Sequence, residues 1–331
     1  MTGTPAPLAS VVVPAWDSGE RIVSTLEALL GQNLLEPFEV IVVESGERGC
    51  GPGVHEAFPA VRFVRSRARL MAGQARNRGV AAARGRWIAF CSDDCVPGRD
   101  WLRLRVAKHL EGFDLVGGSI TNGAPFHPVG IAEYFAEHTA LIPSHRILSR
   151  QAVPHLLSYD RELLARAGPF PEDTLTGEDS VLNQRCLELG AKLGYEPRAS
   201  FAHRGASGFR AFLAHQARHG RGYARCVELY GHQALDHGFA RMLLAYPLWR
   251  WARGLRRVAI GRPAHVPLYL AVAPLTVSGH LALAMGARRE LAAMAQAGVG
   301  RRSRSGSMPQ REPAAASSGE SGQRSGRSSP S

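Results

Sequence analysis

Four short apolar runs alternate with helical patterns at the start of the chain, and this alternation limits the fold more than any other feature. The runs are rich in β-branched residues, as in SVVVPAW and FEVIVVESG, and RIVSTLEALLGQ between them has apolar residues at helical spacing. The runs VRFVRS and RWIAFCS follow, separated by a predicted helix over about residues 73–83. Strands that alternate with helices form a parallel sheet with helices on both faces. The sequence therefore predicts an α/β fold.

Acidic residues stand at the ends of three of these runs. Asp17 follows the first run, Glu44 closes the second, and the pair Asp93–Asp94 follows the fourth. Ligands of such sheets bind at the carboxyl ends of the strands, so we expect these carboxylates along one edge. The pair has a structural alternative, which is to cap the helix that begins near Asp100.

The residues around this pair bear on the kind of metal that the edge would hold. Cys91 and Cys95 flank it, but they are four residues apart with no second cysteine pair, which argues against a zinc site. Carboxylate oxygens without soft ligands favour Mg²⁺ or Mn²⁺.

A second acidic pair, Glu178–Asp179, opens a helical pattern further along, and His203 ends a short apolar run after it. Acids in the first turn of a helix stabilise its dipole, so a structural role accounts for the pair equally well. A single histidine is also commonly structural.

Five stretches taken in order carry a family resemblance: SVVVPAWDSGERIVSTLEALLGQ, EVIVVESG, GQARNRGVAAARGRWIAFCSDDCVP, YDRELLARAGPFPEDTLTGEDSVLNQRCLELG and FAHRG. From about Ser10 to Arg225 their order and spacing resemble the family 2 glycosyltransferases of the GT-A fold. The resemblance implies a Rossmann-like α/β fold, with a mostly parallel sheet and helices on both faces.

The resemblance also implies roles for the residues at matching positions. Asp94 and His203 would hold a divalent cation, Mn²⁺ or Mg²⁺, against the diphosphate of a nucleotide-sugar donor. Asp179, beside Glu178, would be the general base of the catalytic pair. The positions implied to bind the donor are Pro14, Trp16, Asp17, Glu44, Arg76, Asn77 and Asp93.

Several of these positions are also consistent with a purely structural role. Trp16 is typical of a core residue, and Arg76 and Asn77 are typical of a polar helix surface. Ser92 stands where the fuller acidic motif has an acid, and Glu44 stands where the family usually has aspartate. The alternative function is therefore a catalytically inactive GT-A scaffold that binds nucleotide or serves as a partner subunit.

The implied reaction follows from the charges that it creates. A departing nucleotide gains negative charge, which a fixed cation stabilises, and the attacking hydroxyl loses its proton to a carboxylate. This predicts a single displacement with inversion at the sugar. The resemblance implies a UDP-sugar as the first donor to test, and a glycan or lipid-linked sugar of the cell envelope as acceptor. We expect acceptor-side loops around residues 122–146, with His127, Glu133 and Tyr134 on loop surface.

Positive charge is concentrated in the C-terminal part of the chain. The net charge is +12, and fourteen arginines stand against three glutamates from Arg241 to the end. In FARMLLAYPLWRWARGLRRVAIGR the arginines alternate with Leu, Trp and Tyr, which is typical of a helix at an anionic membrane surface. Arginines interleaved with long apolar runs do not form a groove-reading motif, so we expect no nucleic-acid partner.

Residues 263–287 contain no Lys, Arg, Asp or Glu. Their length would allow a membrane span or re-entrant hairpin, but a flat interfacial segment and a soluble packing helix remain alternatives. Because nucleotide sugars are made in the cytosol, we expect the protein at the cytoplasmic face of the membrane.

The predicted organisation has four parts. They are an N-terminal extension (1–9), a GT-A domain (10–225), a helical, membrane-associated region (226–300) and a disordered Ser/Gly/Arg-rich tail (301–331). Five scattered cysteines, an odd number, predict free thiols in a reducing compartment.

Overall fold

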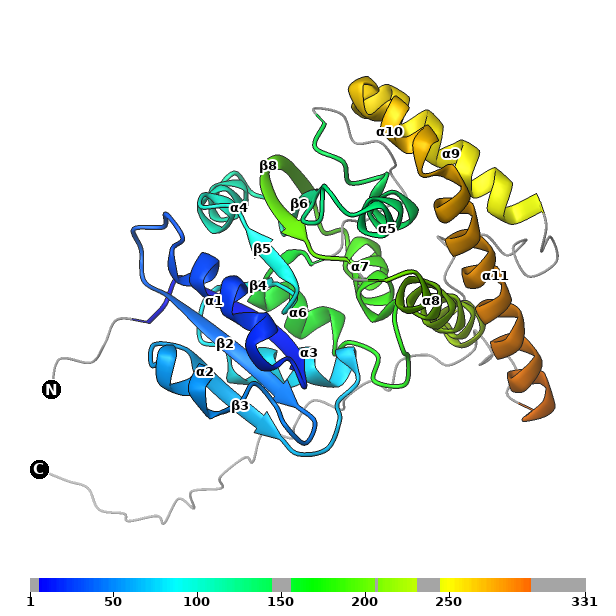
Figure 1. Ribbon diagram of the computed structural model, residues 1–331. Coiled ribbons are helices and arrows are strands. Elements are labelled where there is room, and N and C mark those ends of the chain that lie inside the picture. The colour runs from blue at the N-terminus through cyan, green and yellow to red at the C-terminus, as the bar shows by residue number, and fades with distance from the viewer. Residues whose placement is uncertain (1–5, 145–155, 206–207, 231–244, 299–331) are drawn as a thin grey trace, which may run out of the picture. The chain divides into compact units, whose positions relative to one another are not determined.

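The computed structural model describes residues 6–144, 156–205, 208–230 and 245–298 (Figure 1). Its first half alternates strands and helices as the sequence predicts. The strands are β1 (Ala9–Trp16), β2 (Phe38–Ser45), β3 (Arg62–Ser66) and β4 (Trp87–Phe90). The helices between them are α1 (Val23–Leu30), α2 (Pro52–Ala57) and α3 (Ala72–Ala82). The helix predicted over about residues 73–83 is therefore confirmed.

The second half of the fold adds four strands and four helices in the described residues. The strands are β5 (Cys95–Pro97), β6 (Leu115–Asn122), β7 (Ser158–Asp160) and β8 (Leu193–His203). The helices are α4 (Trp101–Leu110), α5 (Pro128–His138), α6 (Arg161–Ala167) and α7 (Glu178–Glu188). The described strands form one sheet of eight in the order β3-β2-β1-β4-β7-β6-β8-β5.

Among the described strands, β7 and β5 run opposite to the rest of the sheet. β3, β2, β1 and β4 run parallel, as expected. β7 is antiparallel to both β4 and β6, and β5 is antiparallel to β8. β6 and β8 are parallel to each other, and because β7 is antiparallel to both β4 and β6, they run in the same direction as β4. The sheet is therefore mixed, and the prediction of a mostly parallel sheet is confirmed except for β7 and β5.

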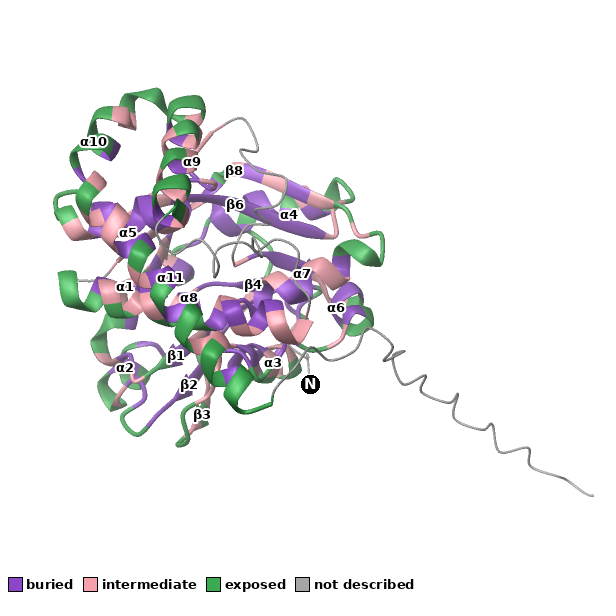
Figure 2. Cartoon of the chain, turned by 90° about the vertical axis from the view of Figure 1, so that its right-hand side faces the viewer, coloured by how far each residue is buried: buried purple, intermediate pink, exposed green. Residues whose placement is uncertain are grey.

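Helices cover both faces of this sheet, as the sequence predicts. Val11 and Val13 of β1 pack with α1 and α4 in one apolar cluster, whereas Val12 packs with α3 and α7 in the other. Because its side chains are buried on both faces, β1 is continuously apolar rather than alternating. Figure 2 shows β1 and β2 buried between these layers, whereas β3 at the edge of the sheet is partly exposed.

Residues 128–138 correct one sequence-based expectation. They form α5, not a loop, and Glu133 and Tyr134 are 2% and 4% exposed. The Tyr134 hydroxyl donates a hydrogen bond to the Ile120 carbonyl, 3.0 Å away. The amphipathic pattern of this segment was hidden by the turn-forming residues just before it.

Four further helices follow the sheet: α8 (Phe209–Tyr230), α9 (Ala245–Gly261), α10 (Val266–Ala271) and α11 (Ala273–Gln296). α8 and α11 lie side by side (Figure 1), in close contact at glycines. A Cβ atom at Gly220 would meet the Leu283 carbonyl, and one at Gly286 would meet the Ala217 carbonyl. The division predicted at residue 225 falls inside α8 and stays a prediction, and the predicted tail lies outside the described residues.

Among the described helices, none by itself is both long and apolar enough to cross a bilayer. Pro263–Ala271 and Ala273–Gln296 meet the length and composition criteria only as a pair, which bends by 76° at the break between them. All five cysteines are buried and free, which confirms the prediction of free thiols.

Candidate functional site

A cavity of about 400 Å³ opens at the carboxyl ends of β1 and β4 and reaches across to α8. Pro14 and Trp16 line it from the first strand. Its charged and titratable lining consists of Arg21, Arg69, Arg76, Arg218, Asp93, His215 and His219. Four arginines against one carboxylate make this cavity suited to an anionic ligand.

Asp93 follows β4 and lines the cavity. Its carboxylate accepts hydrogen bonds from the Ser18 hydroxyl and from Arg21, whose Nη2 lies 2.6 Å away. The Thr25 hydroxyl donates to the Asp93 carbonyl, which fixes the loop after β4. Burial and the neighbouring Asp94 raise the pKa of Asp93, while Ser18 and Arg21 favour its charged form.

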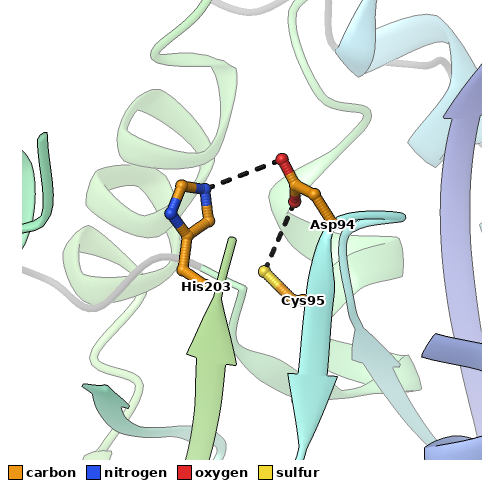
Figure 3. A group of neighbouring side chains, drawn as sticks. All are labelled: Asp94, Cys95 and His203. Atoms are coloured by element: carbon orange, nitrogen blue, oxygen red, sulfur yellow. Dashed lines mark hydrogen bonds and ion pairs between the residues drawn. The ribbon is translucent and has the colours of Figure 1, made fainter. Parts of the chain in front are cut away.

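Asp94 faces the opposite way, toward His203 (Figure 3). The two residues meet because antiparallel pairing places Cys95 of β5 opposite His203, the last residue of β8. The Asp94 Oδ2 and His203 Nε2 atoms are 3.7 Å apart, and their side chains are 32% and 16% exposed. The Cys95 thiol lies 3.5 Å from the Asp94 Oδ1 atom and donates to it. Burial and Asp94 raise the pKa of this thiol well above its usual value, so it is neutral.

These donors fit a divalent cation. A half-exposed carboxylate and an imidazole lie within reach of one ion, and their potential ligand atoms, with that of Cys95, lie within 4.8 Å of one another. Oxygen and imidazole ligands suit Mn²⁺ and Mg²⁺ when other positions are left to phosphate and water. The structure thus brings together the two residues predicted to be metal ligands.

Trp16 lies on the rim of the cavity with 47% of its surface exposed, so the interpretation as a core residue is wrong. The guanidinium carbon of Arg69 lies 3.7 Å from the centre of its ring. An exposed indole beside an arginine offers a flat surface on which an aromatic base can stack.

Asp17 and Glu44 are not among the residues that line this cavity. Asp17, at φ +43°, accepts hydrogen bonds from the backbone N–H groups of Arg48 and Gly49. Glu44 is 1% exposed and accepts from the Cys50 N–H, with His55 Nε2 at 3.1 Å. Both carboxylates hold the loop that follows β2. Their predicted contact with the donor stays a prediction.

The second acidic pair is buried in the first turn of α7. Gly177 precedes it at φ +89°, a conformation that favours glycine, and a Cβ atom there would lie 2.8 Å from the Cys226 sulfur. Glu178 forms an ion pair with Arg76, which is itself buried and lines the cavity. The Asp179 carboxylate accepts a hydrogen bond from the Ser180 N–H at 2.7 Å. Glu178 and Asp179 are 3% and 7% exposed.

Asn77, which follows Arg76 on α3, points toward a neighbouring loop. Its side chain both donates to and accepts from the backbone of Phe170, at 3.0 and 2.9 Å, and also donates to Glu172. Asn77 therefore fixes the segment that leads to α7. It does not line the cavity, and its donor-binding role stays a prediction.

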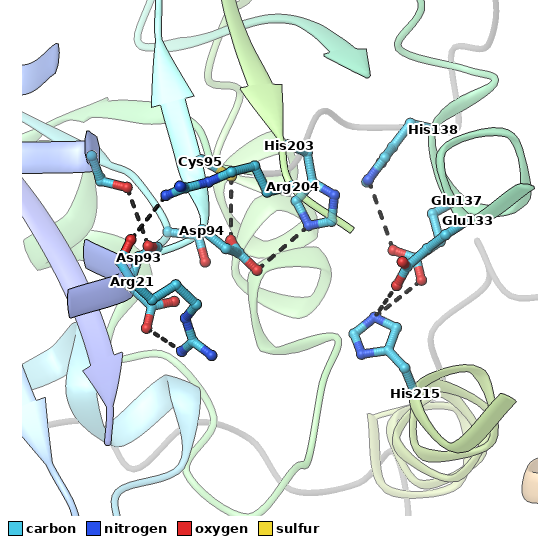
Figure 4. A network of polar contacts seen from close by, with 12 residues as sticks. Arg21, Asp93, Asp94, Cys95, Glu133, Glu137, His138, His203, Arg204 and His215 are labelled. Atoms are coloured by element: carbon cyan, nitrogen blue, oxygen red, sulfur yellow. Dashed lines mark hydrogen bonds and ion pairs between the residues drawn. The ribbon is translucent and has the colours of Figure 1, made fainter. Parts of the chain in front are cut away.

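Several residues of the site are missed by sequence reasoning. Arg21, in the 3₁₀ helix Gly19–Ile22, reaches Asp93, and Arg69, in the loop after β3, reaches Trp16; nothing in the sequence marks either residue. His215, Arg218 and His219 reach the cavity from α8, where they stand three and four residues apart. Figure 4 shows His215 directed at the carboxylates of Glu133 and Glu137 on α5. The helical spacing of the histidines was the one available signal.

The chain is similar to known glycosyltransferases in sequence and in fold. Residues 10–125 match the model of the family described as Glycosyl transferase family 2. The chain is 26% identical over 256 residues to glycosyltransferase AglE of Haloferax volcanii, covering 75% of this chain and 81% of that protein. It is 28% identical over 215 residues to the succinoglycan biosynthesis protein ExoO of Rhizobium meliloti, covering 59% of this chain and 60% of ExoO.

A third relative is the pre-mycofactocin glycosyltransferase of Mycobacterium tuberculosis, 29% identical over 232 residues that cover 64% of this chain and 46% of that protein. Among solved structures, the chain is similar to the mannosyltransferase PcManGT of Pyrobaculum calidifontis, solved in complex with GDP-Man and Mn²⁺. The TM-score is 0.55 with 20% identity, covering 87% of this chain and 88% of that one. At this identity the likeness concerns the fold, which is GT-A-like.

Proposed function

Since this chain is a family 2 glycosyltransferase, we propose that it is a metal-dependent, inverting enzyme that moves a sugar from a nucleotide-sugar donor to an acceptor hydroxyl. The proposal is supported mainly by one observation: a candidate cation site lies next to a cavity that is lined by arginines. Asp94 and His203 lie next to Asp93, which lines a cavity with four arginines. A diphosphate that bridges the two would meet positive charge on both sides.

The chain's own residues divide the work of binding the donor. Trp16 and Arg69 present a stacking surface at the rim, and Arg218 adds positive charge to the wall of the cavity. Arg21 and Arg76 also line the cavity, but they are paired with Asp93 and Glu178. Asp94 and His203 would hold Mn²⁺ or Mg²⁺, and a bound ion would stabilise the negative charge that develops on the leaving diphosphate. The Cys95 thiol, as a donor to Asp94, fixes the orientation of that carboxylate.

The acceptor must lose a proton as it attacks the sugar. Asp179 is the carboxylate that we assign to this step, because Arg76 already neutralises its neighbour Glu178. The Ser180 N–H holds one Asp179 oxygen in place at 2.7 Å. Attack from the side opposite the leaving group gives inversion at the sugar.

Calorimetric titration tests the donor assignment. UDP, GDP and dTDP would each be titrated into the purified protein with and without Mn²⁺. We expect one nucleotide to bind at least tenfold more tightly with the ion, UDP being the first candidate and GDP the second. Equal affinity for that nucleotide after chelation would contradict the proposal, as would unchanged product formation by D94A.

The acceptor class is proposed from what the names of the relatives state. ExoO is named for the biosynthesis of succinoglycan, a glycan by its name. We therefore propose a cell-envelope glycan or a lipid-linked sugar as the acceptor.

We also propose that the protein works at the cytoplasmic face of a membrane. Leu248, Trp249 and Ile260 of α9 are 60%, 44% and 49% exposed, on a helix that also carries the exposed Arg256. Exposed apolar groups next to arginines support attachment to anionic lipid.

Flotation with vesicles that contain anionic lipid tests this attachment. The double variant L248S/W249S should float less than the wild type, and the wild type should be released by high salt. L35S removes a leucine that is 96% exposed far from α9 in sequence, and it serves as the matched control. Equal flotation of the double variant and the control would contradict the proposal.

A further inference from the structure

A second group of metal-ligand side chains lies on the helical wall of the cavity. Glu137 comes from the last turn of α5, and His215 and His219 come from adjacent turns of α8, four residues apart. Residues at this spacing share one face of a helix, so both imidazoles face α5. Figure 4 shows His215 meeting the carboxylates of α5 at a place separate from Asp94.

The distances in this group agree with those around a single small ion. The Glu137 Oε1 atom lies 3.1 Å from His215 Nε2 and 3.6 Å from His219 Nδ1. Ligands about 2.1 Å from a tetrahedral Zn²⁺ are about 3.4 Å from one another. All three ligand atoms lie within 4.8 Å of one another, so one ion could contact each of them after small rotations of the side chains.

We propose that Glu137, His215 and His219 form a second metal site that binds Zn²⁺ or a similar transition-metal ion. Two imidazoles and one carboxylate suit Zn²⁺, Co²⁺ or Ni²⁺, whereas the Asp94 site offers its ion one carboxylate and one imidazole beside a neutral thiol. His215 and His219 both line the cavity, so a fourth position of the ion would face it and be open to water or to an oxygen of the acceptor.

Residues around the three ligands hold them in place. Gln216, which is fully buried, donates a hydrogen bond to the Glu137 Oε1 atom. His138 Nε2 lies 3.8 Å from Glu137 Oε2, and a Glu133 oxygen lies 3.6 Å from His215 Nε2. Such outer partners orient metal ligands in known sites. The site would also join α5 to α8 across one wall of the cavity.

The same side chains could instead form a plain ion-pair cluster. Burial alone would lower the pKa of His215, but the Glu137 carboxylate raises it to about 9. Without an ion, a protonated His215 would then balance Glu137. A metal site and an ion-pair cluster differ in whether a transition-metal ion binds to Glu137, His215 and His219, and visible absorption measures this directly.

Co²⁺ is the probe that separates a metal site from an ion-pair cluster, because tetrahedral Co²⁺ absorbs visible light far more strongly than octahedral Co²⁺. The full-length protein, freed of metal by chelation, would be titrated with Co²⁺ and then with Zn²⁺ in competition. We expect one equivalent of tetrahedral Co²⁺, displaced by Zn²⁺, without the sulfur-to-cobalt charge-transfer band that binding at Cys95 would give.

Variants assign the signal to its site. H219N and E137Q should each weaken Co²⁺ and Zn²⁺ binding by about 100-fold, the upper end of what losing even an outer partner costs. D94N should leave the tetrahedral signal unchanged, and H127N, which alters an exposed histidine at the start of α5, is the matched control. Circular dichroism of each variant would verify its fold, and E137Q and H219N provide independent removals of a ligand.

Three outcomes would overturn the proposal. They are no tetrahedral signal in the wild type, which would leave an ion-pair cluster only, a signal that D94N removes, and a signal that survives in both H219N and E137Q. None of them depends on whether the enzyme transfers sugar.

Discussion

The two acidic pairs of this chain, Asp93–Asp94 and Glu178–Asp179, are similar in the contacts of their first residue and differ in the contacts of their second. In each pair the first carboxylate is held by an arginine: Asp93 by Arg21, and Glu178 by Arg76. The second carboxylate meets other groups. Asp94 faces His203, and Asp179 accepts from the backbone of Ser180. The arginine neutralises one charge of each pair, which lowers the cost of placing a second charge beside it.

The elements that carry the pairs account for their difference. Asp93 and Asp94 follow a strand, and the side chain of Asp94 is 32% exposed at the sheet edge, where an ion and its water ligands have room. Glu178 and Asp179 stand in the first turn of a helix and are less than a tenth exposed. The same two-residue pattern is therefore suited to hold a cation in one place and to accept a proton in the other.

Asp93 and Asp94, which follow β4, are called the strand-borne pair, and Glu178 and Asp179 of α7 the helix-borne pair. Replacing Asp94 tests the strand-borne pair and should have the largest effect on activity. D94N keeps the size of the side chain but removes the charge that would hold the cation, so product formation should fall by about 1,000-fold. Mn²⁺ titration by calorimetry should lose its heat in parallel. D100N, which changes an aspartate whose side chain is 45% exposed at the start of α4, is the control, and D94N activity equal to that of D100N would remove Asp94 from the site.

Replacing Glu178 tests the arginine-held member of the helix-borne pair. E178Q leaves Arg76 charged and buried without its partner, which should lower the free energy of unfolding by about 3–5 kcal/mol in urea melts. E111Q breaks the Lys108–Glu111 pair, which is 2.6 Å long on the surface, and should cost less than about 1 kcal/mol. Equal losses in the two variants would show that Arg76 is not held by Glu178.

Replacing Asp179 tests the other member of the same pair. D179N should lower kcat by about 100-fold, the usual scale for loss of a general base, while donor affinity stays within about twofold. D173N removes an exposed carboxylate from the loop before α7 and should change neither quantity. A fall in donor affinity without a fall in kcat would assign Asp179 to binding instead of proton transfer.

The comparison also shows what the sequence could and could not predict. The strands before Asp17, Glu44 and Asp93 are continuous β-branched runs, and parallel strands bring their carboxyl ends to one edge whatever the side chains are. That rule placed Asp93 and Asp94 correctly. It also placed Asp17 and Glu44 at the carboxyl ends of β1 and β2, although their carboxylates accept from the backbone of the loop after β2 and do not line the cavity.

Contacts between helices that are distant in sequence could not be predicted from rules about single strands and helices. The meeting of Glu137 with His215 and His219 depends on how α5 packs against α8, and no local pattern specifies which helix faces meet. The mixed direction of β7 and β5 was missed for a similar reason. Each has three residues, too few to show a period.

The smallest predicted effect concerns His109, which packs against β4, the strand that precedes Asp93 and Asp94. The His109 ring stacks on Trp87, the first residue of β4, with ring centres 5.6 Å apart. Its Nδ1 donates to the Phe113 carbonyl at 2.8 Å, and its Nε2 lies 2.9 Å from the Ser158 hydroxyl. Burial, with help from Arg105, lowers the pKa of His109 to about 4.

This depressed pKa gives the stability of the protein a definite pH dependence. The unfolded chain takes up a proton on His109 near pH 6.5 and the folded chain only near pH 4, so stability is full above 6.5 and declines as the pH falls between these values. From pH 7.5 to 5 the loss should be about 2 kcal/mol in urea melts. H109Q cannot titrate, so it should flatten the slope even though it is less stable at pH 7.5. At pH 5, amide exchange of the wild type should also rise in β4 before it rises in α7, because the protonated ring stacks on Trp87 of β4. Equal slopes for H109Q and the wild type would mean that another group sets the acid limit.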